Sequence, residues 1–148
     1  YPAGETEQRL YRVSHPQRIN SQASESTASR LARLFGKEPA HGWCYFYQQG
    51  DLARREGDWE VARRLWEQAA AKGLQPRSGA EFLPFIEAYS MLGDWPKAAE
   101  ISLQAGKSGD TASLVCHAWE RLLQSTEESD SRTKAFAEVQ GAFSCPPD

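Results

Sequence analysis

The chain has 148 residues, of which 40% are hydrophobic and 11% aromatic, and its formal net charge is −3. This length and composition predict a globular domain with its own core and exclude a disordered or collagen-like chain. No run of 18 or more apolar residues is present, so no membrane span is predicted, and the mild charge does not indicate a nucleic-acid binder. The chain begins at Tyr1 rather than Met, which indicates a processed protein or an excised part of a longer one.

The first 40 residues form a region of their own. Residues 1–37 contain six Lys/Arg and three Asp/Glu, and residues 1–20 show no sustained hydrophobic period, so we expect an irregular basic arm. Residues 21–36 carry apolar residues at spacings of three and four and end in glycine, which predicts an amphipathic helix. Because the first half of that stretch is rich in serine, a mobile linker is the alternative.

Residues 41–148 read as a helical repeat domain with units at about 43–76, 79–109 and 110–143. In the first two units, apolar residues recur at the spacing of one helix face, once before and once after a corner. These faces carry Trp43, Phe46, Tyr47, Gly50 and Ala53, then Trp59, Ala62, Trp66, Ala69 and Ala70, and in the second unit Phe82, Phe85, Ile86, Tyr89 and Leu92, then Trp95, Ala98, Ala99, Ser102 and Ala105.

A Gly-Asp-Trp triplet stands at each of these two corners. The triplets are Gly57, Asp58, Trp59 and Gly93, Asp94, Trp95. We expect the glycine to end one helix, the aspartate to cap the next and the tryptophan to pack the corner. The two glycines are 36 positions apart, which indicates an internal repeat.

Other helix starts depend on their capping residues. Ser78 and Glu81 have the spacing of a capping box, which would place Pro84 inside the second unit's first helix and bend it, whereas a start near Glu81 removes the conflict. In the third unit, Asp110 and Asp130 are expected to cap helices, the second of which ends before Pro146.

These residues resemble the tetratricopeptide repeat, which has an aromatic and a small residue in its first helix, Gly-Asp-aromatic at the corner and Ala-aromatic-Ala in its second helix. The first unit matches at Phe46, Gly50, Gly57, Asp58, Trp59, Ala62, Trp66, Ala69 and Pro76, and the second at Phe82, Tyr89, Gly93, Asp94, Trp95, Ala98 and Ala105. The second unit departs from the pattern at Ile86 and Ser102. The resemblance implies an all-α, right-handed stack of two to three helical hairpins, preceded by one helix and an irregular arm.

A narrower resemblance is to a bacterial group in which such a repeat domain is the soluble C-terminal part of polytopic membrane proteins, some of glycosyltransferase type. It rests on the segments at residues 34–36, 38–39, 41–47 and 51–54. It implies that this chain is a non-catalytic part of a larger membrane-associated protein. It places that part on the extracytoplasmic side of a bacterial membrane, with the cytoplasm as the alternative.

Tetratricopeptide arrays generally bind peptides in a concave groove lined by their first helices. By position, the groove residues here are Tyr47, Asp51, Arg54, Leu83, Glu87 and Ser90. Because these positions lack the Lys and Asn that clamp a terminal carboxylate, a basic or apolar-aromatic segment is favoured over an acidic one. The alternative is that these are exposed side chains of a structural spacer.

We expect no metal site, cofactor or catalytic centre. Adjacent residues on a helix point about 100° apart, so Cys116 and His117 do not converge on a zinc ion, and His41 with Cys44 supplies only two of the four ligands needed. Buried small cysteines and surface histidines are expected instead. The odd number of cysteines argues against a disulfide-built scaffold.

The tryptophans and the basic residue pairs do not indicate a binding site for carbohydrate or nucleic acid. All five tryptophans, Trp43, Trp59, Trp66, Trp95 and Trp119, lie on predicted core faces, which favours packing over a carbohydrate- or base-stacking platform. Basic pairs such as Arg54 and Arg55 stand among acidic residues, so nucleic-acid binding is not expected. The sequence therefore predicts a non-enzymatic module that binds a protein or peptide segment. A purely structural or self-associating segment, such as a homodimer, is the alternative, and an enzyme is the third hypothesis.

Overall fold

Helices and the turns between them make up the described part of the chain, and no strand occurs within it. The computed structural model describes residues 36, 40–106 and 111–145. The chain divides into two units, residues 1–40 and 41–148. The arm and helix expected in the first unit lie outside the described residues, so the second unit alone is described below.

The described residues contain six α-helices and one 3₁₀ helix, which confirms the all-α prediction for this part of the chain. The elements are α3 (Trp43–Glu56), α4 (Trp59–Ala71), η2 (Gly79–Phe82), α5 (Leu83–Met91), α6 (Trp95–Ala105), α7 (Ala112–Ser125) and α8 (Asp130–Phe143).

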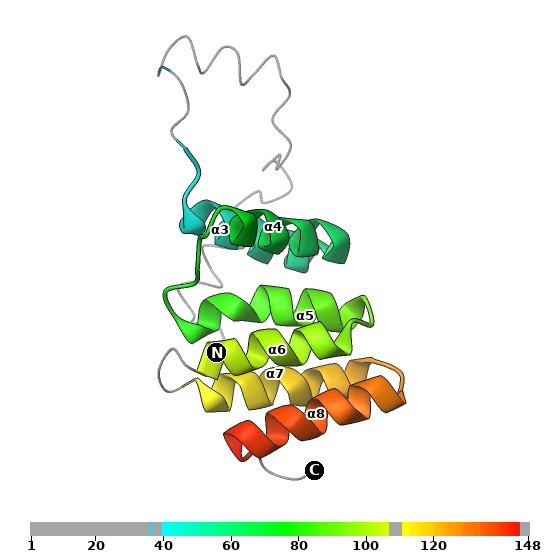
Figure 1. Ribbon diagram of the computed structural model, residues 1–148. Coiled ribbons are helices and arrows are strands. Elements are labelled where there is room, and N and C mark those ends of the chain that lie inside the picture. The colour runs from blue at the N-terminus through cyan, green and yellow to red at the C-terminus, as the bar shows by residue number, and fades with distance from the viewer. Residues whose placement is uncertain (1–35, 37–39, 107–110, 146–148) are drawn as a thin grey trace, which may run out of the picture. The chain divides into compact units, whose positions relative to one another are not determined.

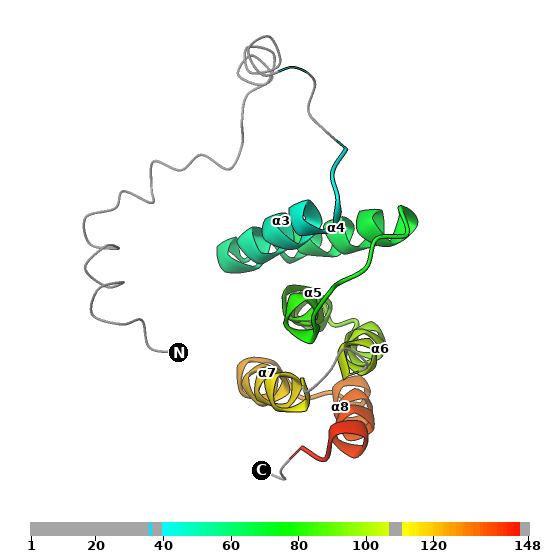
Figure 2. The ribbon, with the colours of Figure 1, turned by 90° about the vertical axis from the view of Figure 1, so that its left-hand side faces the viewer.

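The helices stack as successive pairs along the chain (Figure 1). α3 packs on α4, α4 on α5, and α5 on α6, and the odd-numbered helices also contact one another, α3 with α5 and α5 with α7. In Figure 2, α5 and α7 lie on one side and α6 and α8 on the other, while the α3–α4 pair is turned relative to the helices below it. The third pair departs from the pattern because α8 packs more against α6 than against its own partner α7.

The two Gly-Asp corners have the same backbone geometry. Gly57 and Gly93 adopt left-handed conformations with φ of 75° and 79°, which glycine reaches without steric cost. The N–H of Asp58 and of Asp94 bonds the carbonyl five residues earlier, at 2.8 and 2.9 Å. Each aspartate side chain then accepts from the N–H three residues later, at 3.1 and 3.3 Å. At each corner the glycine thus ends one helix and the following aspartate caps the next.

The tryptophans of the two corners differ in burial. Trp95 is 5% exposed and lies 5.9 Å from the Trp119 ring, centroid to centroid. Trp59 is only partly buried, against the expectation that all five tryptophans belong to the core, because it packs on a small cluster of alanines that cannot cover its ring. The shared sequence position therefore does not give a shared environment.

The second unit begins as predicted by the alternative in which its first helix starts near Glu81 and Pro84 does not bend it. η2 precedes α5, and Pro84 lies in the first turn of α5, where its missing N–H costs no helical bond. The capping box does not form, since the Ser78 side chain makes no capping bond. Glu81 accepts instead from the Arg77 backbone N–H at 2.7 Å and from Trp43 Nε1 at 2.6 Å.

Ser129, rather than Asp130, caps α8. Its side chain accepts from the Arg132 N–H at 3.2 Å, while Asp130 occupies the first helical turn, where its charge favours the helix dipole. The Asp110 cap lies outside the described residues. Arg132 is 9% exposed and donates to the Leu123 carbonyl at 3.2 Å and to the Thr126 carbonyl, which ties α8 to the end of α7.

Trp119 explains the departure of the second unit at Ser102. The Ser102 hydroxyl donates to the Ala98 carbonyl at 2.8 Å and accepts from Trp119 Nε1 at 2.9 Å. An indole from α7 therefore packs where the tetratricopeptide pattern places an aromatic residue of the helix itself. Ser90 is also buried, at 2% exposed, but its hydroxyl has no partner.

The two buried serines make a matched test. Ser102→Ala should lower the free energy of unfolding by about 1–3 kcal/mol, because it leaves the buried Trp119 N–H unpaired. Ser90→Ala should be neutral or stabilising by up to about 1 kcal/mol, because it removes an unpaired hydroxyl. Urea unfolding followed by circular dichroism measures both, and equal destabilisation by the two variants would contradict this account.

Candidate binding surface

Four charged side chains join α3, α5 and α7 across one side of the stack. We call Asp51, Arg54, Glu87 and Arg121 the charged cluster. Arg54 binds Asp51 at 2.8 Å within α3 and Glu87 of α5 at 3.2 Å, and Arg121 of α7 binds the other oxygen of Glu87 at 3.0 Å. Asp51 also accepts from Arg55 at 3.0 Å. Each carboxylate therefore already has two arginine partners.

The pair between Arg54 and Glu87 is less exposed than an ordinary surface ion pair. The Glu87 side chain is 14% exposed and that of Arg54 is 30% exposed, whereas Arg121 is 62% exposed. Burial alone lowers the pKa of the Arg54 guanidinium, but the hydrogen bonds and charges of Asp51 and Glu87 outweigh it, so that its pKa is raised. Asp51 and Glu87 thus favour the charged form of Arg54 between the first two helical pairs.

An apolar hollow of about 320 Å³ lies beside the charged cluster. We call it the α5–α7 hollow. Its lining comes from α5, α7 and the start of α4, and consists of Trp59, Glu87, Met91, Ala118, Arg121, Leu122 and Ser125. Met91 is 39% exposed, so the hollow presents apolar surface with an ion pair at its edge.

The predicted groove residues do not all reach this surface. Asp51, Arg54 and Glu87 are brought together in the charged cluster. Tyr47 and Leu83 are partly buried against the core, and Ser90, at 2% exposed, is inaccessible to a partner in this structure. The short helix α5 packs on four neighbouring helices, α3, α4, α6 and α7, so its exposed stripe is too narrow to present all its predicted positions.

Sequence reasoning missed Arg121 and Met91. Asp51 and Glu87 stand 36 residues apart, which is the spacing of the two Gly-Asp-Trp corners. This spacing is a sequence signal that the two carboxylates lie on the same side of the stack. No such signal marks Arg121, because the third unit has no Gly-Asp-Trp corner with which to align it. Met91 precedes the second corner and belongs to no core face.

The cysteines are arranged differently from the expectation. Cys116 and Cys145 form a disulfide between α7 and the segment after α8, across a sequence separation of 29. The third cysteine, Cys44, is exposed rather than buried, because it lies one position from the buried Trp43 and faces away from the core. Within the described residues, no three His, Cys, Asp or Glu side chains are grouped to hold a metal ion.

Comparisons of the sequence with protein-family models, with curated proteins and with solved structures find no match. Among the described helices, none combines the length and apolar character needed to cross a membrane. Function is therefore inferred from the arrangement of side chains.

Glu87→Gln tests the charged cluster. It should lower the free energy of unfolding by roughly 1–3 kcal/mol, because it removes one of the two counter-charges of the partly buried Arg54 and leaves only Asp51, which also binds Arg55. The control is Glu60→Gln, which breaks an exposed pair with Arg63 and should change stability by less than about 1 kcal/mol. Urea unfolding measures both variants. An equal loss of stability in the two would show that the ion pairs of Glu87 contribute no more than an exposed surface pair.

Cys145→Ser tests the disulfide. Opening a loop of this length should lower the free energy of unfolding by roughly 3–4 kcal/mol. Cys44→Ser, at the exposed free thiol, should change it by less than about 0.5 kcal/mol. Alkylation of the unreduced wild-type protein followed by mass spectrometry should find one reactive thiol, and finding three would contradict the pairing.

Proposed function

We propose that residues 41–148 form a non-enzymatic, tetratricopeptide-like module, a right-handed stack of helical hairpins that binds an apolar segment of another protein in the α5–α7 hollow. Support for the repeat comes from the two corners, which share their glycine conformation, their aspartate cap and their 36-residue spacing. The contacts of α3 with α5 and of α5 with α7 support a common side for the first helices.

The main support for a binding role is the exposed apolar hollow, whose charged edge residues already form ion pairs with each other. Protein interfaces commonly have an apolar centre and a polar rim. Met91, Leu122 and Trp59 supply the apolar part, and the Glu87–Arg121 pair supplies the rim. Burying one aliphatic side chain of a partner here would contribute about 1.5–3 kcal/mol.

Asp51 and Glu87 already bind arginines of this chain, which favours an apolar partner segment over a basic one. Asp51 accepts from Arg54 and Arg55, and Glu87 accepts from Arg54 and Arg121. A basic side chain would have to displace an arginine to reach either carboxylate. The same engagement supports a binding rather than a catalytic role, since neither carboxylate is available as a general base.

We further infer that the module works in an oxidising compartment, as part of a larger membrane-associated protein. The Cys116–Cys145 disulfide supports the compartment, because disulfides persist outside the reducing cytosol. An extracytoplasmic position is therefore favoured over the cytoplasmic alternative. The membrane association is supported by the sequence resemblance alone.

Selection from a displayed library of random peptides tests the proposed function. On the purified 148-residue chain, enriched peptides should share an apolar anchor residue. Met91→Asp should weaken their binding at least tenfold, because an unpaired carboxylate would line the hollow. Leu114→Asp alters an apolar side chain of similar exposure, 44% against 39%, outside the hollow, and should leave binding unchanged.

Two outcomes would overturn this proposal. Equal weakening by Met91→Asp and Leu114→Asp would remove the hollow from the binding site. A concentration-dependent dimer in light scattering, lost in Met91→Asp, would show that a second copy fills the hollow and would favour the self-associating alternative.

A further inference from the structure

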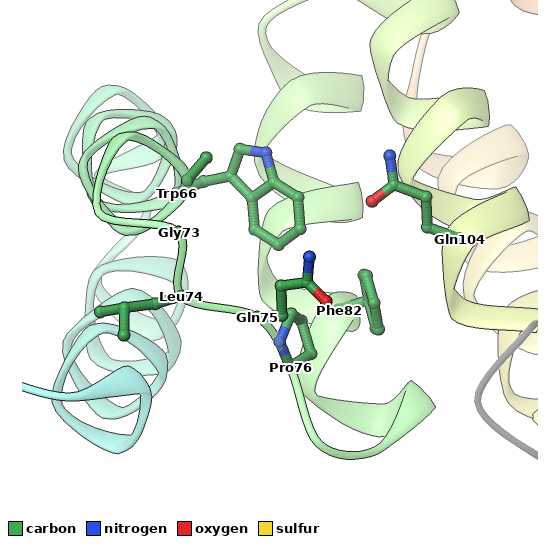
Figure 3. Close-up of a pocket in the computed structure, with 8 residues that line it drawn as sticks. Trp66, Gly73, Leu74, Gln75, Pro76, Phe82 and Gln104 are labelled. Carbon is green, nitrogen blue, oxygen red and sulfur yellow. The ribbon is translucent and has the colours of Figure 1, made fainter.

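A second pocket, of about 530 Å³, opens between the second helices of the first two pairs (Figure 3). We call it the exit-loop pocket, because the segment that leaves α4 forms one of its walls. Its lining consists of Trp66, Ala70, Gly73, Leu74, Gln75, Pro76, Phe82 and Gln104. None of these residues lines the α5–α7 hollow. The volume lies within the roughly 300–1,000 Å³ that is usual for ligand sites.

Trp66 lines this pocket and carries an indole N–H without a hydrogen bond to the described residues. It is only 9% exposed, and Nε1 donates to no described residue, whereas the indoles of Trp43 and Trp119 donate to Glu81 and Ser102. A nearly buried indole usually finds a partner for its N–H. Since Trp66 reaches open space at the exit-loop pocket, an acceptor in the pocket could satisfy this donor.

Two glutamine amides complete the polar groups of the pocket. Figure 3 shows Gln75 and Gln104 reaching toward the region of Trp66 from the exit loop and from α6. Gln104 Nε2 donates to Glu100 at 3.1 Å, and no described residue donates to its Oε1. The amide of Gln75 has no hydrogen bond to the described residues. The pocket therefore offers both donors and acceptors.

The lining excludes several classes of ligand. None of the lining residues is charged, so a charged ligand would lose water without gaining a counter-ion. Sugars and nucleobases need an exposed aromatic face for stacking, but Trp66 and Phe82 are 9% and 5% exposed. The face of Trp66 is also covered by Phe85, with 5.1 Å between ring centroids. A peptide backbone, with alternating carbonyl and N–H groups and no charge, fits what remains.

We propose that the exit-loop pocket is a second peptide site, which takes an uncharged, extended segment. A backbone carbonyl of the segment accepts from Trp66 Nε1, and a neighbouring backbone N–H donates to Gln104 Oε1. A small apolar side chain of the segment packs on Pro76, which lies beside Gln75 (Figure 3). The segment must be extended, because the backbone groups of a helix are already bonded to one another. This site acts whether or not the α5–α7 hollow binds a partner.

Nuclear magnetic resonance of the ¹⁵N-labelled 148-residue chain tests the proposal directly. The probe is the blocked tripeptide acetyl-Ala-Leu-Ala-amide, titrated to tens of millimolar. The Trp66 indole N–H signal, assigned with a Trp66→Phe variant, should shift in a saturable way together with the side-chain amide signals of Gln75 and Gln104. The Trp119 indole signal should stay in place, because that N–H is already bonded inside the core.

Matched probes and variants decide the outcome. The Gln75→Ala and Gln104→Leu double variant should bind the tripeptide about three- to tenfold more weakly, while Gln124→Ala, at an exposed glutamine of α7, should bind as the wild type does. Acetyl-Ala-Glu-Ala-amide and methyl glucoside should not shift the Trp66 signal. No saturable shift with the neutral tripeptide, or a stronger shift with the sugar or the acidic peptide, would overturn the proposal.

Discussion

The close approach of α3 to α5 at Gly50 and Phe85 is the contact that brings the first two helical pairs together. A Cβ atom on Gly50 would lie about 2.6 Å from the Phe85 ring, so only glycine lets the first helical pair settle on the second. The same ring packs on Trp43 and Trp66 from the other side. The charged cluster and the exit-loop pocket both span the boundary between these two pairs.

The two sides of the stack present different chemistry. Around α3, α5 and α7, carboxylates held between arginines edge an apolar hollow. Between α4 and α6, the lining carries no charge and its polar groups are amides and one indole N–H. A partner that uses both sides would therefore be recognised by an apolar side chain at one and by its backbone at the other.

The last pair closes the described stack rather than repeating it. α8 packs on α6, Phe143 lies where a side chain at Gly106 would otherwise project, and the disulfide fastens the segment after α8 to α7. Trp119, at 0% exposed, fills the space between α6 and this pair. Within the described residues, the shifted helix α8 and the covalent link thus cover apolar surface of α6 and α7.

The sequence alone determined the features that depend on neighbouring residues. Helix faces, the left-handed glycines Gly57 and Gly93 and their aspartate caps all follow from preferences that act within a few residues. Tertiary structure alone decided the rest: the pairing of Cys116 with Cys145, the joining of Arg121 to Glu87, and the burial of Ser90. These depend on the angles at which helix pairs cross, which are set by residues far apart in the sequence, such as Gly50 and Phe85, and no local pattern records them.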